Sequence, residues 1–163
     1  MTGTRSRTLR AAAVCLLALA PLITGAATAS AADASPDGRI NHSCGPTINA
    51  FATSGAKPVE TSRKISDGAQ VNLSHGYNST YGEVMWAHLF NGTNTDLGTD
   101  WVWMDWSDTK NAWHQCGPAV LDGSQGLRDR WTWAVNEVPG RYFRACAMWT
   151  GNNLVQCTGW HQH

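Results

Sequence analysis

The residues best suited to chemistry in this chain are aromatic side chains that lie near a histidine and a carboxylate in two β-prone segments. The chain has nine tryptophans. Five residues form the candidate ligand-binding set: Trp86, His88, Trp101, Trp103 and Asp105. A flat indole ring can stack on the apolar face of a sugar, while imidazole and carboxylate groups hydrogen-bond to its hydroxyls. These residue types therefore favour non-covalent binding of a glycan.

The five residues share one face only if their two segments pair. Side chains alternate between faces along a strand, so Trp101, Trp103 and Asp105 point the same way. A symmetric hairpin of Glu83–Asn91 with Asp100–Ser107 separates the two faces cleanly. Its core face would pair Met85 with Trp106, Ala87 with Met104, and Leu89 with Val102. Its outer face would pair Trp86 with Asp105, His88 with Trp103, and Phe90 with Trp101. Alternatively, the rings pack under a loop, across strands or against a second sheet.

Other arrangements that could carry chemistry are weak. The sequence contains no Gly-x-Ser-x-Gly elbow, and no Cys-x-x-Cys or His-x-x-x-His spacing typical of zinc sites. The histidines of His161-Gln-His163 are expected to form a free tail. A pair of carboxylates for glycoside hydrolysis could be drawn from Glu83, Asp105 and Asp108, but surface carboxylates are ordinary. We therefore predict no catalytic residue, no metal site and no cofactor.

The first 31 residues read as a secretory signal peptide. Arg5, Arg7 and Arg10 precede an apolar run from Ala11 to Ile23, and the segment ends in an Ala-x-Ala exit at residues 29–31. The apolar run is shorter than the about 20 residues that span a bilayer. We expect an exported protein without a membrane anchor, cleaved after Ala31, with a flexible lead-in over residues 32–43 and a β domain over residues 44–163.

Cleavage changes the charge balance. Removing three arginines from 12 basic residues leaves nine against 12 acidic ones, a net charge of −3. Proteins that bind nucleic acid usually carry a basic patch, so nucleic acid is not an expected partner. Attraction to anionic membranes is disfavoured for the same reason.

Four cysteines remain after cleavage, an even number that predicts two disulfides in an exported chain. Three connectivities are possible. Folding Arg141–Trp149 onto Leu154–Trp160 around Thr150-Gly-Asn-Asn153 places Cys146 opposite Cys157, within disulfide range. We therefore predict the pairs Cys146–Cys157 and Cys44–Cys116.

Short β-prone runs broken by turn residues about every ten positions predict an all-β domain. The expected strands are Thr47–Thr53, Val59–Ile65, Gln70–His75, Glu83–Asn91, Asp100–Ser107, Ala112–Ala119, Arg130–Asn136, Arg141–Trp149 and Leu154–Trp160. Val138-Pro-Gly140 before an aromatic strand is typical of immunoglobulin-like domains. The expected fold is an immunoglobulin-like antiparallel β-sandwich of about 7–9 strands with two disulfides.

Four segments carry a resemblance: Trp103-Met-Asp-Trp-Ser107, Trp113-His-Gln-Cys-Gly-Pro118, Phe143-Arg-Ala-Cys146 and Cys157-Thr-Gly-Trp160. Together they resemble small secreted proteins of actinomycete-type bacteria that have four cysteines and a tryptophan-rich β domain. The resemblance covers most of the chain after the signal and implies export and the two bridges. It implies no activity.

The sequence therefore predicts a secreted, monomeric binding protein whose partner is an extracellular polysaccharide or cell-wall polymer. A second hypothesis is an exported inhibitor of a secreted protease or glycosidase that presents the loop Leu121–Asp129. A third is a small secreted hydrolase in which Asp105 acts. Retention on insoluble polysaccharide separates the first hypothesis from the second, and loss of activity with a retained fold in Asp105→Asn would support the third.

Overall fold

The computed structural model describes residues 42–62, 64–65, 68–95, 98–121 and 128–163. The predicted signal peptide and most of the predicted lead-in lie outside the described residues. The described residues form eleven strands: β1 (Ser54–Thr61), β2 (Gln70–Asn78), β3 (Gly82–Phe90), β4 (Asn94–Thr95), β5 (Gly98–Ser107), β6 (His114–Val120), β7 (Arg130–Trp131), β8 (Val135–Asn136), β9 (Tyr142–Trp149), β10 (Leu154–Cys157) and β11 (His161–Gln162). One 3-10 turn, η1 (Ala50–Ala52), precedes them.

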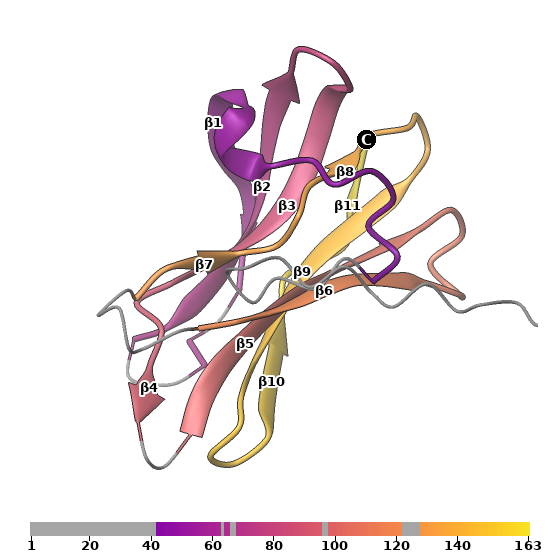
Figure 1. The fold of residues 1–163 in the computed structure, drawn as a ribbon. Coiled ribbons are helices and arrows are strands. Elements are labelled where there is room, and N and C mark those ends of the chain that lie inside the picture. Colours follow the sequence, from indigo (N-terminus) through magenta and orange to yellow (C-terminus); the bar gives the residue numbers. More distant parts are fainter. Residues whose placement is uncertain (1–41, 63, 66–67, 96–97, 122–127) are drawn as a thin grey trace, which may run out of the picture.

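The strands make two antiparallel sheets that face each other (Figure 1). The first sheet has the order β1-β2-β3-β7, and β8 also pairs with β3. The second sheet has the order β10-β9-β5-β4, with β6 on β5 and β11 on β9. The predicted antiparallel β-sandwich is confirmed. Several strands are only two residues long, which brings the total above the nine expected.

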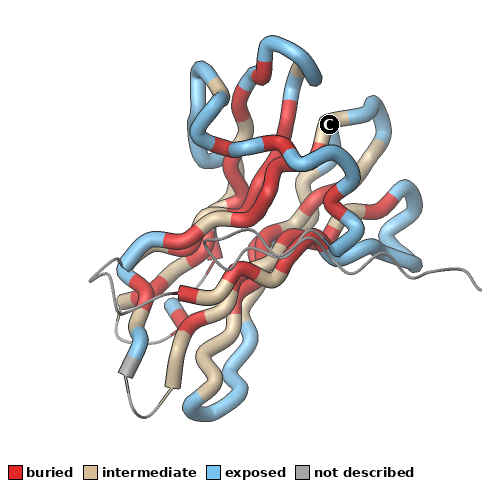
Figure 2. The backbone as a smooth tube through the Cα atoms, viewed as in Figure 1, coloured by how far each residue is buried: buried red, intermediate tan, exposed pale blue. Residues whose placement is uncertain are grey.

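The sandwich core follows from strand alternation. Inner side chains of β2 and β3, such as Leu73 and Leu89, are fully buried, and so are Val102 and Met104 on β5 and Phe143 on β9. Burial is concentrated in the middle of the strands, while the connecting turns are exposed (Figure 2). The alternating apolar residues thus mark the inner faces of both sheets, as expected for a half-buried strand.

The predicted hairpin between Glu83–Asn91 and Asp100–Ser107 is wrong. Strand β3 pairs with β2, β7 and β8 in the first sheet, while β5 pairs with β9 and β6 in the second. The apolar residues that the hairpin would have placed side by side instead meet face to face across the core. Alternation fixes which face of a strand is buried, but does not tell lateral pairing from packing across a sandwich.

Three other local predictions need correction. Thr47–Thr53 is not a strand, because η1 occupies it and the side chain of Asn49 accepts a hydrogen bond from the Phe51 backbone N–H at 3.1 Å. Arg130–Asn136 is split into two short strands. The predicted free tail is instead β11, in which His161 pairs with Phe143 and the backbone N–H of His163 donates to Arg141 O at 3.2 Å.

Both predicted disulfides are present. Cys146 and Cys157 are direct partners in the β9–β10 ladder, with Cα atoms 4.1 Å apart. Cys44 and Cys116 are bridged across a sequence separation of 72 residues. Two disulfides are typical of proteins in an oxidising compartment. Within the described ranges, no helix is long and apolar enough to span a bilayer.

Candidate functional site

The outer face of the first sheet is covered in part by the chain that leads into β1. This segment starts at the Cys44–Cys116 bridge and crosses the outside of β3 and β8 (Figure 1). Ile48 pairs with Ala134 on the way. A second apolar cluster forms beneath the segment and consists of Ile48, Ala50, Val84, Trp86 and Ala134, with Trp131 packed against it.

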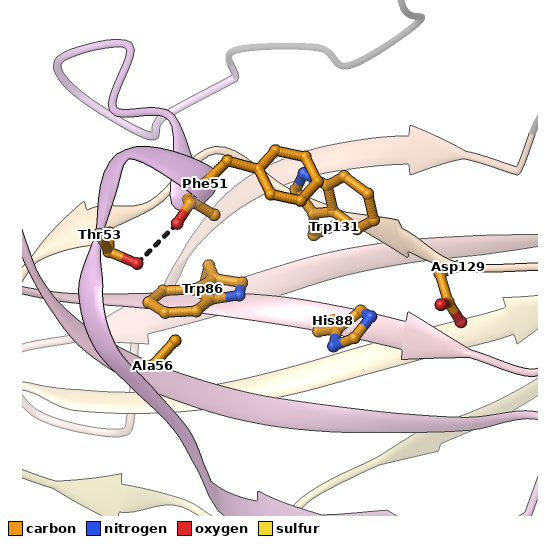
Figure 3. Close-up of a pocket in the computed structure, with 8 residues that line it drawn as sticks. Phe51, Thr53, Ala56, Trp86, His88, Asp129 and Trp131 are labelled. Atoms are coloured by element: carbon orange, nitrogen blue, oxygen red, sulfur yellow. Dashed lines mark hydrogen bonds between the residues drawn. The ribbon is translucent and has the colours of Figure 1, made fainter.

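A pocket of about 460 Å³ opens at the edge of this cluster. It is lined by Ala50, Phe51, Thr53, Ala56, Trp86, His88, Asp129 and Trp131 (Figure 3). The volume lies within the range of about 300–1,000 Å³ that is typical of small-molecule sites. Its walls come from three parts of the chain: η1 with the start of β1, strand β3, and the entry to β7.

Aromatic rings dominate the pocket. The rings of Phe51 and Trp131 meet edge to face with centroids 4.0 Å apart, and the ring of His88 lies 5.8 Å from that of Trp131. Trp86 is 6% exposed, whereas Phe51 is 68% exposed. Figure 3 shows Phe51 and Trp131 together on one side of the pocket, across from Trp86 and His88. Trp86 therefore acts as a buried floor, and Phe51 as an accessible wall.

Two side chains give the pocket polar character. Burial lowers the pKa of His88 below its ordinary value of 6.5, and the carboxylate of Asp129 opposes this shift. His88 is consequently neutral at pH 7, when its imidazole can both donate and accept a hydrogen bond. Asp129 is exposed, and its carboxylate can accept hydrogen bonds from hydroxyl groups.

Gly76 on β2 allows Trp86 to lie flat against the sheet. A Cβ atom at this position would be 3.0 Å from Cη2 of Trp86, 3.1 Å from Oγ1 of Thr53 and 3.2 Å from the Ser54 backbone oxygen. The floor of the pocket therefore depends on the absence of a side chain at residue 76.

The structure divides the predicted ligand-binding set. Trp86 and His88 line the pocket on the first sheet. Trp101, Trp103 and Asp105 lie on β5, opposite Met148, Cys146 and Arg144 of β9. This second group is on the outer face of the second sheet, with the whole core between it and the pocket. The five residues therefore do not form one surface.

On this second face the polar groups are paired with each other. The Nε and Nη2 atoms of Arg144 lie 2.9 and 2.8 Å from Oδ2 of Asp105. The guanidinium also contacts two indole rings, 4.6 Å from the ring centre of Trp160 and 5.1 Å from that of Trp113. Burial raises the pKa of Asp105 above its ordinary value, and Arg144 and Trp103 oppose the rise. The cation that an aromatic platform could bind is thus supplied by the protein itself.

Sequence reasoning missed six of the eight lining residues, among them Phe51, Asp129 and Trp131. Their positions span some 80 residues of chain, and no local spacing connects them. Trp131 could be recognised as an aromatic residue in a predicted strand, but not as a neighbour of Trp86. Of the predicted inhibitory loop Leu121–Asp129, residues 122–127 lie outside the described residues.

Comparisons with known proteins give no relative that bears on the site. Searches of protein-family models, curated proteins and solved structures found no match for this chain.

Proposed function

We propose that this domain is a secreted binding module that holds an uncharged sugar unit of an extracellular glycan in the pocket between Phe51, Trp86 and Trp131. The observation that carries the proposal is the composition of the pocket: three aromatic rings together with one neutral imidazole and one carboxylate. Aromatic surface with a few fixed polar groups is the usual lining of a small-molecule site. The export signal and the two disulfides support action outside the cell.

The lining favours an uncharged ligand with hydroxyl groups. The rings of Phe51 and Trp131 offer apolar surface for the C–H face of a pyranose. His88 in its neutral form and Asp129 can each hydrogen-bond to a hydroxyl. An anionic ligand would meet the carboxylate of Asp129 without a cation among the lining residues, so acidic sugars are disfavoured.

The test is retention of the protein, purified without reductant, on insoluble chitin, cellulose and peptidoglycan, with tryptophan fluorescence as a companion signal. We expect retention on one of these polymers and a fluorescence change with its soluble oligosaccharide. Trp131→Ala should abolish both. Trp113→Ala is the matched control, because Trp113 is 52% exposed but lies beside Arg144 on the second sheet.

Two results would contradict the proposal. One is the absence of retention on all three polymers together with an unchanged fluorescence spectrum. The other is equal retention of Trp131→Ala and the wild-type protein. If Trp113→Ala loses retention and Trp131→Ala does not, the glycan binds to the second sheet, where Trp101 and Trp103 lie.

A further inference from the structure

A cluster of histidine and glutamate side chains lies between the two sheets at one end of the sandwich. The β2–β3 ladder pairs Leu73 with Ala87 and His75 with Met85, and Leu73, Ala87 and Met85 all belong to the core. His75 therefore continues the inner face of β2, and Glu83 continues that of β3. At this end of the core, charged and titratable groups replace the apolar residues that alternation would otherwise place there.

Residues from β8 and β11 complete the cluster. Glu137 follows β8, and its backbone N–H donates to Glu83 O at 2.8 Å. In Figure 1 the C end of the chain, after β11, lies beside β8. The Nδ1 and Nε2 atoms of His163 lie 2.7 Å from Oε2 of Glu137 and 3.2 Å from Oε2 of Glu83. The Nε2 atom of His75 lies 3.7 Å from Oε1 of Glu137.

Glu137 is the unusual member of this cluster. Its side chain is 0% exposed, yet neither carboxylate oxygen accepts a hydrogen bond from the described residues. Its nearest cationic partner is the imidazole of His163, whose Nδ1 atom lies 2.7 Å from Oε2. A buried carboxylate is costly unless it is paired, and the two partners of Glu137, His75 and His163, carry charge only when they are protonated.

Electrostatics around Glu137 point the same way. The carboxylates of Glu83 and Glu137 both lie within 3.2 Å of His163, and a histidine carries a positive charge only when it is protonated. The histidines thus compensate the two carboxylates only in part. A bound cation would compensate them more fully, because its charge would lie closer to both groups.

We propose that His75, Glu83 and Glu137 form a binding site for a divalent transition-metal ion such as Zn²⁺, with His163 as the adjacent fourth donor. The ligand atoms of the first three residues all lie within 4.8 Å of one another. Bonds of about 2.0–2.1 Å to a tetrahedral Zn²⁺ place its ligand atoms roughly 3.3 Å apart. The distances from His163 to Glu83, 3.2 Å, and from His75 to Glu137, 3.7 Å, are close to that spacing. The 2.7 Å contact between His163 and Glu137 is shorter and would have to widen when the ion binds.

The donor types select the class of metal. Imidazole nitrogen with carboxylate oxygen suits Zn²⁺ and its first-row neighbours, whereas Ca²⁺ takes six to eight oxygen ligands. Two carboxylates balance the charge of a divalent ion. Glu83 and His163 are 49% and 35% exposed, which provides a route from solvent to the buried carboxylate. The ion would join the first sheet to β11 of the second.

The experiment is calorimetric titration of the metal-free, full-length protein with Zn²⁺ and separately with Ca²⁺, with any purification tag free of histidine. We expect one Zn²⁺ per chain and no binding of Ca²⁺. Glu137→Gln should weaken Zn²⁺ binding by roughly 100-fold or more, because an amide replaces a charged ligand. Glu60→Gln is the matched control, since Glu60 lies outside the cluster and its carboxylate is 3.9 Å from His161.

Two further variants test the site even if the buried Glu137→Gln substitution prevents folding. Glu83→Gln alters a partly exposed side chain, and His75→Gln is compared with His114→Gln, an exposed histidine elsewhere. Co²⁺ should give the visible bands of a tetrahedral site in wild-type protein and lose them in Glu83→Gln. Failure of the wild-type protein to bind Zn²⁺ would overturn the proposal, as would wild-type affinity in Glu83→Gln. Neither result bears on glycan retention.

Discussion

Both outer faces of the sandwich carry tryptophans near a carboxylate, but one face has an open pocket and the other has a paired arginine. On the first sheet, Phe51 and Trp131 surround an open pocket whose polar groups, His88 and Asp129, face a ligand-sized space. On the second sheet, Trp113 and Trp160 contact the guanidinium of Arg144, which is paired with Asp105. Aromatic rings beside a carboxylate therefore leave an open pocket on the first sheet, whereas on the second sheet a cation of the protein itself occupies the position beside the rings.

The origin of the difference is the segment before β1. It lies over the first sheet, buries Trp86 and brings Phe51 to Trp131. On the second face Trp113 stays 52% exposed, so none of the described segments covers it in this way. The pocket is thus built by a long-range connection and fixed by the Cys44–Cys116 bridge, whereas the second face is built from neighbouring strands.

The largest effect is expected on removing that bridge with Cys44→Ser/Cys116→Ser. The bridge closes a loop across a sequence separation of 72 residues, and the loop-entropy model gives about 4 kcal/mol of lost stability. The free energy of unfolding in urea measures the loss. We also expect weaker glycan retention, because the segment that carries Phe51 is released.

The matched control is Cys146→Ser/Cys157→Ser, which opens a separation of only 11 residues and should cost about 3 kcal/mol. This pair lies on the second face, so retention on glycan should be kept where the protein is folded. Equal loss of retention in both double variants would show that the pocket does not depend on the segment before β1.

The next largest effect is expected for Asp105→Ala on the second face. Asp105 is 3% exposed at its side chain and Arg144 25%, so the variant leaves a partly buried guanidinium without its carboxylate. A loss of about 2 kcal/mol is expected for a charged hydrogen-bonded pair of this exposure. Added acetate should restore part of the melting temperature if the two indole rings still hold Arg144. If Asp105→Ala has the wild-type melting temperature without acetate, the pairing of Asp105 with Arg144 does not stabilise the second face.

A smaller effect is expected for Gly76→Ala beneath the pocket. The new methyl group would press on Trp86 and Thr53 at 3.0–3.1 Å, and overpacking of this kind costs about 1–2 kcal/mol. Because Trp86 forms the floor of the pocket, its displacement should clearly weaken glycan retention even though the protein stays folded. Gly159→Ala serves as the control, because its Cβ would meet only Glu60 Oε2 at 3.8 Å. Wild-type retention in Gly76→Ala would show that Trp86 does not define the pocket.

The smallest effect is a pair of opposite pH dependences. The folded pKa of His88 is lowered, so the unfolded chain binds more protons just below pH 6.5, and stability is lost as the pH falls through this window. The folded pKa of Asp105 is raised, so its contribution to stability is lost as the pH rises above 3.8. Unfolding free energies across pH 4–7 should show the first slope reduced in His88→Gln and the second reduced in Asp105→Asn. A His88→Gln protein with the wild-type profile between pH 5 and 6.5 would contradict the first assignment.

The sequence by itself determined the features that depend on local pattern. Alternation of apolar residues marked the inner faces, and turn residues between Trp149 and Leu154 fixed a register that placed Cys146 opposite Cys157. With four cysteines after the signal, the second bridge followed. A hairpin with a short turn has one favoured register, which is why this region could be predicted from sequence.

The tertiary structure alone decided which faces meet. Whether β3 pairs beside β5 or packs across the core from it is not encoded in alternation, so Trp86 and His88 were wrongly joined to Trp103 and Asp105. The pocket and the cluster at His75, Glu83 and Glu137 unite residues from strands and connections far apart in the chain. Such contacts have no spacing that a sequence could show, because the position of each residue depends on the packing of both sheets.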